Sequence, residues 1–162
     1  MCNLNPTSRG SIRISSTDPA RDPTIRMNYL DSQLDRDVTV EGLKTLRRIY
    51  QQPAFKDLWK REVIPGEDKK TDAELLGAIR ANATTVYHLV GTCRMGSDAR
   101  AVLDPRLRVR GVHGLRVVDA SVMPEIVSGN TNAPTIMIGE RASDLILEDA
   151  RREDRACPPS IA

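Results

Sequence analysis

Residues able to do chemistry occur at two places far apart in the chain. His88 ends a β-branched and aromatic segment, residues 84–90, and a glycine turn follows it directly. A neutral imidazole at the end of a strand, next to a loop, can act as a base near pH 7. The alternative is a hydrogen-bonded core histidine. The second histidine, His113, lies in a glycine-rich turn without a polar sequence neighbour, and we expect it on the surface.

The second place is a polar loop within residues 114–140. A short apolar strand is predicted at residues 115–118, the loop contains Asn130, Thr131 and Asn132, and Pro134 opens an apolar-striped helix. Unpaired N–H groups at a helix start attract electron-rich ligand groups. The pattern is consistent with a ligand site, and an ordinary strand-to-helix connection with asparagine caps accounts for it equally well.

Other polar residues give weaker indications. Asp119 follows the short strand and can accept a ligand hydroxyl or simply the N–H groups of the next turn. Cys93 is expected to be a small buried apolar residue. The chain shows no carboxylate pair, no Ser-His-Asp order, no phosphate-binding loop and no G-x-G-x-x-G pattern.

The elements that must position these residues suggest an α+β chain. Residues 11–15 and 24–29 alternate polar and apolar types, as half-buried strands do, and can pair with each other. A helical repeat follows Asp37, a shorter helix is indicated near Phe55 and Trp59, and Thr71 with Glu74 forms a capping box. A long helix is predicted from about residue 134 to 152. We expect one domain over residues 1–152 and a disordered tail over 153–162.

Composition excludes several classes of function. A net charge of +2 and a 3% share of aromatic residues argue against a nucleic-acid or anionic-membrane partner. There is no apolar run long enough for a transmembrane helix and no secretory signal pattern. The three cysteines are too scattered for a zinc site or a disulfide framework, so no metal and a cytoplasmic location are expected; they are Cys2, Cys93 and Cys157.

Several ordered motifs resemble one known family, the glucose–methanol–choline (GMC) oxidoreductases. Residues 88–96 read HLVGTCRMG and are similar to the family's HPVGTCRMG, with Leu89 in place of its proline. Residues 102–123 are similar to VVDPxLRVxGxxGLRVVDASVMP, and residues 127–140 to SGNTNAPTIMIGE. The start of the chain, residues 6–10 and 18–29, matches the beginning of the family's C-terminal region. The resemblance covers about residues 5–150.

The resemblance implies an FAD-dependent enzyme that oxidises an alcohol. Its fold would be a substrate-domain sheet with helices, followed by a C-terminal strand and a long helix that return to the flavin domain. His88 matches the catalytic histidine, and Asn130 matches the second member of the catalytic pair. The positions implied to line the flavin are Asp119, Ala120, Thr131, Asn132 and Ala133.

The family's dinucleotide fingerprint has no counterpart in this sequence. We therefore expect a C-terminal portion that acts with an N-terminal FAD-binding half, in cis or in trans. That half would also supply the partner surface for the last helix, which is apolar over much of its circumference. The alternative is a non-catalytic remnant that binds no FAD alone and associates through exposed apolar surface. The sequence does not specify the alcohol or the electron acceptor.

Overall fold

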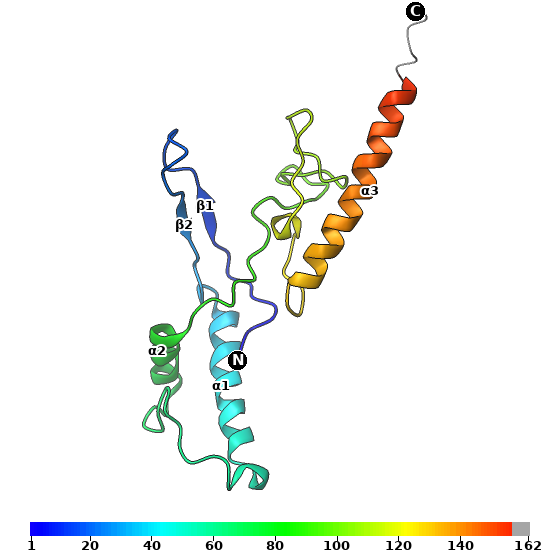
Figure 1. Cartoon of the computed structure of the whole chain (residues 1–162). Helices are drawn as coiled ribbons and strands as arrows, with labels where there is room; N and C mark the ends of the chain where they lie inside the picture. The colour runs from blue at the N-terminus through cyan, green and yellow to red at the C-terminus, as the bar shows by residue number, and fades with distance from the viewer. Residues whose placement is uncertain (157–162) are drawn as a thin grey trace, which may run out of the picture. The chain divides into compact units, whose positions relative to one another are not determined.

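The computed structural model describes residues 1–156, and its helices and short strands confirm the α+β class (Figure 1). The sequence indicated one domain over residues 1–152, whereas the structure groups the chain into two compact units. The first unit is Met1–Val86 and the second begins at Tyr87.

The first unit opens with the predicted hairpin. Strands β1 (Ser11–Arg13) and β2 (Thr24–Arg26) pair antiparallel, with Ile12 opposite Ile25. Every residue of both strands is exposed. The predicted pairing is confirmed. The strands are shorter than predicted, and the half-burial that the alternating pattern indicated is wrong.

Helix α1 (Gln33–Tyr50) begins four residues before Asp37, the residue at which the sequence placed its start. Ser32 caps it, because its hydroxyl accepts the backbone N–H of Asp35 at 3.1 Å. The helix then lies beside α2 (Asp72–Asn82) in Figure 1. The predicted capping box at α2 is confirmed, with both reciprocal bonds between Thr71 and Glu74 present.

A buried carboxylate fixes the start of the chain to α1. The Asp35 side chain is 2% exposed. It accepts the backbone N–H groups of Thr7 at 2.8 Å and Ser8 at 2.7 Å, and the Asn3 amide at 3.2 Å. Burial alone would raise the pKa of Asp35, but the bonds from Ser8 and Thr7 outweigh it and hold that pKa well below its ordinary value.

The connection between α1 and α2 is irregular. A single 3-10 turn, η1 (Pro53–Phe55), replaces the short helix predicted there, and the backbone N–H of Trp59 bonds to the Phe55 carbonyl at 2.8 Å. Arg47 of α1 holds the later part of this connection through a bidentate pair with Glu62, with both N–O distances at 2.7 Å. That pairing holds the pKa of Glu62 below its ordinary value.

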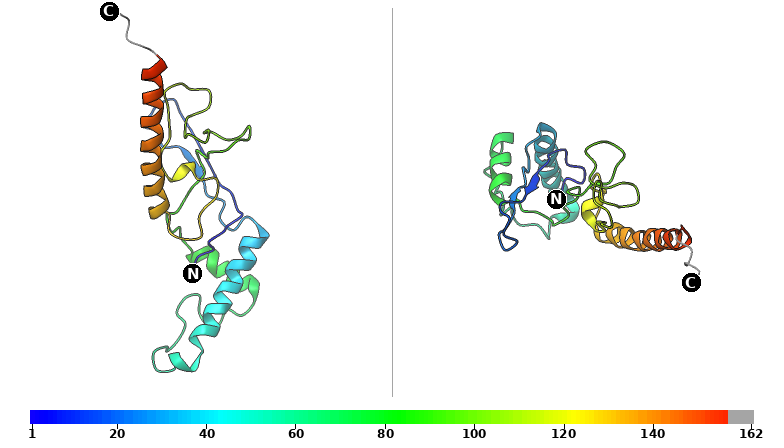
Figure 2. Two further views of the ribbon diagram at one scale, coloured as in Figure 1. Left: turned by 90° about the vertical axis from the view of Figure 1, so that its right-hand side faces the viewer. Right: turned by 90° about the horizontal axis from the view of Figure 1, so that it is seen from above.

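The second unit is built on one long helix, α3 (Asn132–Ala156), which is unbroken in all three views (Figure 2). It begins two residues before Pro134, because the Thr131 carbonyl already accepts the N–H of Thr135 at 3.0 Å. It continues to Ala156, so the boundary predicted at residue 152 falls inside the helix. The rest of the predicted tail, residues 157–162, lies outside the described residues.

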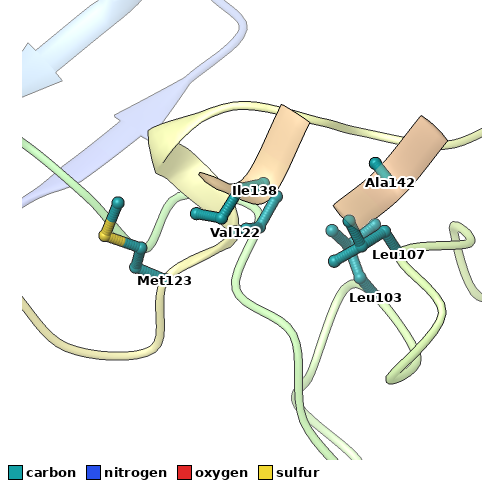
Figure 3. Packing of buried hydrophobic residues seen from close by; sticks show 6 residues of the cluster. All are labelled: Leu103, Leu107, Val122, Met123, Ile138 and Ala142. Carbon is teal, nitrogen blue, oxygen red and sulfur yellow. The ribbon is translucent and has the colours of Figure 1, made fainter. Parts of the chain in front are cut away.

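An apolar cluster joins α3 to the segments that precede it (Figure 3). Ile138 and Ala142 point from one side of the helix toward the short turn η2 (Ala120–Val122) and the connecting segments. Leu103 and Val122 are fully buried. The cluster comprises Leu103, Leu107, Val122, Met123, Ile138 and Ala142.

Ion pairs hold the same segments to the second half of the helix. Arg106 bonds to Asp149 at 2.7 Å and to Glu148 at 3.1 Å, and Arg116 also bonds to Asp149. Arg106, then Arg116, lowers the pKa of Asp149 to about 2. The strand predicted at residues 115–118 reduces to a single antiparallel bridge between Arg108 and Arg116.

Candidate functional site

The segment that carries His88 is fixed to the η2 turn by backbone hydrogen bonds. The N–H groups of Gly91 and Cys93 both bond to the Ser121 carbonyl at 3.1 Å, and the N–H of Met95 bonds to the Val122 carbonyl at 2.9 Å. Residues 84–90, predicted to be strand-like, therefore have no strand pairing. The residues that follow, Gly91, Cys93 and Met95, bond to the η2 turn and not to a neighbouring strand.

Gly91 is required by this path. Its φ of +89° lies in the region that favours glycine, and a Cβ there would lie 3.4 Å from the Met123 carbonyl oxygen. Tyr87, immediately before His88, also has a positive φ of 61°. The chain thus turns sharply on both sides of the histidine, which directs its ring toward the start of α3.

The structure brings His88 together with two residues more than 40 positions later. The Nε2 atom of His88 lies 3.1 Å from Asn130 Oδ1, and its Nδ1 atom lies 2.9 Å from Thr131 Oγ1. Thr131 is buried, His88 is half-buried and Asn130 is exposed. Both ring nitrogens therefore have a partner, and the Nε2 side faces the accessible residue.

These partners are compatible with either tautomer of a neutral ring. In one arrangement Nε2–H donates to Asn130 Oδ1, because an amide oxygen only accepts, and the Thr131 hydroxyl donates to Nδ1. If the Thr131 hydroxyl rotates and the Asn130 amide flips, donor and acceptor exchange in both hydrogen bonds. The site thus accommodates a ring whose basic nitrogen is either Nδ1 or Nε2.

The remaining predicted site residues lie around the same point. Asn132 and Ala133 form the first turn of α3 and are exposed. Ala120 belongs to η2 and is half-buried. The Asp119 side chain caps η2 by accepting the N–H of Ser121 at 2.7 Å. This is the turn-forming role that the sequence left open beside a ligand contact.

One contact was not anticipated from the sequence. Thr131, which the resemblance implies to line the flavin, bonds through its hydroxyl to His88. The signal available was its position beside Asn130 at a helix start, which does not indicate a partner 43 residues earlier.

The loop after Cys93 is stabilised by an ion pair. Arg94 makes a bidentate pair with Asp98 at 2.7 and 2.8 Å.

Within residues 1–152, whose side chains the structure describes, no cluster of three or more histidine, cysteine or acidic side chains is arranged to hold an ion. Likewise, none of the described helices is both long enough and apolar enough to span a membrane.

Comparison with known proteins agrees with this arrangement. The sequence model of the GMC oxidoreductase family matches residues 6–139, which is most of the chain. The chain belongs to the GMC oxidoreductase family and corresponds to the C-terminal domain of its members.

Individual relatives show which part of these proteins the chain matches. It is 48% identical to an alcohol dehydrogenase (acceptor) of Pseudomonas putida, over 91% of this chain and 27% of that protein. It is 44% identical to an oxygen-dependent choline dehydrogenase of Escherichia coli O127:H6, over 99% of this chain and 28% of that protein. The chain therefore spans a little more than a quarter of the length of these relatives.

A solved structure gives the same result. An FAD-dependent oxidoreductase from Chaetomium thermophilum superposes with a TM-score of 0.85 at 31% identity, over 91% of this chain and 26% of that one. The likeness therefore extends to the three-dimensional fold.

Proposed function

We propose that this chain supplies the catalytic base of an FAD-dependent oxidoreductase that converts an alcohol to a carbonyl compound. The observation that carries the proposal is the contact of His88 with exposed Asn130, across 42 residues of sequence. The alcohol and choline dehydrogenases among the relatives support the class of substrate.

The reaction separates a hydroxyl proton from a hydride. When bound, FAD supplies the acceptor for the hydride that leaves the alcohol carbon. His88 takes the hydroxyl proton on Nε2, the nitrogen that faces exposed Asn130. Asn130 holds the substrate oxygen through its amide and so fixes the hydroxyl against the ring.

The start of α3 suits an electron-rich edge of the cofactor. The first N–H groups of a helix have no intrahelical acceptor, and the exposed residues Asn132 and Ala133 form the first turn of α3 directly after Asn130 and Thr131. The helix dipole adds partial positive charge at the same end. We assign Asn132 and Ala133, with Asp119 and Ala120, to the cofactor side of the site, where negative charge on the reduced ring would be stabilised.

The adenine and pyrophosphate of FAD need a further binding half, in cis or in trans. The exposed face of α3 supports such a partner. Ile136 is 65% exposed and Leu147 is 54% exposed, and their spacing of 11 residues puts both on the side of the helix away from Ile138. A helix that is apolar on both sides needs a second packing surface.

We place the complete protein in the cytoplasm, where the free cysteines Cys2 and Cys93 stay reduced.

The test compares the two histidines of the chain. In the flavin-loaded enzyme that contains this chain, His88→Ala should lower turnover by about 10²- to 10⁴-fold, the usual contribution of a general base, while flavin stays bound. His113→Ala is the matched control and should leave turnover within about twofold, an effect below 0.5 kcal/mol. Near-normal turnover in His88→Ala would refute the assignment.

The exposed apolar side chains of α3 also favour the second candidate, a non-catalytic remnant that associates through this surface. The discriminating measurement is visible absorbance after incubation of the chain with FAD and desalting. Retained, stoichiometric flavin would exclude the remnant. Concentration-dependent association without flavin, together with no turnover when the flavin-binding half is added, would favour it.

A further inference from the structure

We propose that Thr131 is a positioning residue that holds the His88 ring and exchanges its hydroxyl between donor and acceptor as the ring changes protonation state. The inference rests on the proposed function, because it concerns how His88 acts as a base. It assigns to Thr131 a role toward the histidine in place of the flavin contact expected from the sequence.

The first argument is the rigidity of the support. Thr131 is 7% exposed, and its Oγ1 atom lies 2.9 Å from Nδ1 of His88. Its own carbonyl accepts both the N–H of Thr135 at 3.0 Å and the Thr135 hydroxyl at 2.6 Å. The hydroxyl that meets the ring is therefore attached to the bonded first turn of a 25-residue helix.

The second argument is the asymmetry of the two partners. Asn130 is exposed, so a substrate hydroxyl can replace its bond to Nε2, whereas buried Thr131 keeps its bond to Nδ1. One nitrogen is thus left for chemistry and the other is reserved for orientation. A mobile ring would lose the alignment that proton transfer requires.

The third argument is the chemistry of a hydroxyl. With the ring neutral and Nε2 protonated, the Thr131 hydroxyl donates to Nδ1. For Nε2 to accept the proton of an alcohol, the ring proton must be on Nδ1, and Oγ1 must then accept a hydrogen bond from Nδ1–H. After the transfer both ring nitrogens carry protons, and Oγ1 continues to accept from Nδ1–H. A hydroxyl serves all three states by rotation about one bond, which a carboxylate cannot do because it only accepts.

The kinetic test uses the flavin-loaded enzyme that contains this chain. Thr131→Val keeps the shape of the side chain and removes the hydroxyl, and Thr131→Ser keeps the hydroxyl. We expect Thr131→Val to lower kcat about tenfold, equivalent to about 1.4 kcal/mol, with KM within twofold, and Thr131→Ser to restore most of the loss. Adding Thr131→Val to His88→Ala should change kcat by less than twofold, because the residue acts through the histidine.

The spectroscopic test uses the 162-residue chain itself. It has only two histidines, so His113→Gln assigns the ring ¹⁵N signals of His88 without ambiguity. In the wild type, His88 Nδ1 should show the shift of a hydrogen-bonded ring nitrogen. Thr131→Val should move it to that of an unbonded one, Thr131→Ser should restore it, and the His113 signals should stay unchanged.

The outcomes separate this inference from the proposed function. If His88→Ala abolishes turnover but Thr131→Val leaves both kcat and the Nδ1 shift unchanged, Thr131 does not position the ring and only this inference fails. An unbonded Nδ1 shift in the wild-type chain overturns it equally. If His88→Ala leaves turnover intact while Thr131→Val still moves the Nδ1 shift, the contact is real and the proposed function fails.

Discussion

Asp35 in the first unit and His88 in the second are both ionisable side chains that bond to segments far away in sequence, yet they differ in what they leave open. Asp35 is 2% exposed and receives bonds from three residues of the chain start. His88 is half-buried and has one partner on each ring nitrogen, of which Asn130 is exposed.

The difference separates a group with a structural role from the histidine that we propose as a base. A carboxylate surrounded by backbone donors has no lone pair directed at solvent, so its bonds serve only the fold. A ring whose outer partner a ligand can displace keeps one nitrogen for proton transfer. The proposal for His88 therefore rests on its exchangeable partner and not on the strength of its hydrogen bonds.

The largest effect on stability should come from Asp35. Asp35→Ala removes a buried carboxylate and the acceptor of the Thr7 and Ser8 N–H groups, which should reduce the free energy of unfolding by about 3 kcal/mol. Chemical denaturation followed by far-ultraviolet circular dichroism measures it. The matched control is Asp37→Ala on the exposed side of α1, with an expected loss below about 0.5 kcal/mol. Equal losses in both variants would remove the basis of the comparison.

Acid should weaken the second unit through Asp149. Because its folded pKa of about 2 lies below its ordinary 3.8, this group contributes stability that is complete above about pH 4 and is lost as pH falls toward 2. Asp149→Asn should lower the unfolding midpoint at pH 7, by less than Asp35→Ala does, and flatten this part of the pH dependence. If the pH dependence of stability in Asp149→Asn matched that of the wild type, the loss would belong to other carboxylates of the second unit, first Asp98 and Asp104, whose pKa values are also lowered.

A smaller effect is expected at Asp119, where a turn cap and a cofactor contact are both possible. Asp119→Ala should cost about 1 kcal/mol of unfolding free energy through loss of the bond to the Ser121 N–H, and Asp119→Asn, which keeps an acceptor, should cost less. Flavin retention in the flavin-loaded enzyme is the second readout. Loss of flavin in Asp119→Asn without loss of stability would show that the carboxylate charge serves the cofactor.

The smallest stability effect should come from His88. His88→Gln should change the free energy of unfolding by less than about 0.5 kcal/mol, because the side chain is half-buried and glutamine can bond to one of its partners. Thermal unfolding of the 162-residue chain measures the difference. A loss comparable to that of Asp35→Ala would make His88 a structural group and reverse the comparison.

Local features of the fold were predictable because their causes are local. The capping box at Thr71 and Glu74 and the pairing of β1 with β2 follow from residues a few positions apart. The predicted start of α1 is late because the helical repeat of apolar residues is clear only after Asp37. The actual cap, Ser32, is followed by a carboxylate, Asp35, whose partners lie near the chain start. No pattern within the helix indicates those partners.

The candidate site depended on information of another kind. His88 and Asn130 meet because three backbone bonds fix the histidine segment to η2, and these bonds involve carbonyl and N–H groups common to every residue. Side-chain types cannot signal them. Their pairing entered through resemblance to a family, and the contact of Thr131 with His88, which no motif marks, required the structure.

The single tryptophan lies in one unit and both histidines lie in the other, so each unit has its own spectroscopic reporter. Trp59 lies half-buried after η1 in the first unit, and both histidines lie in the second. Intrinsic fluorescence excited at the indole thus monitors only the first unit, and imidazole resonances monitor only the second. Recording both along one denaturation series would show, without any introduced label, whether the two units lose their structure in one cooperative step or one after the other.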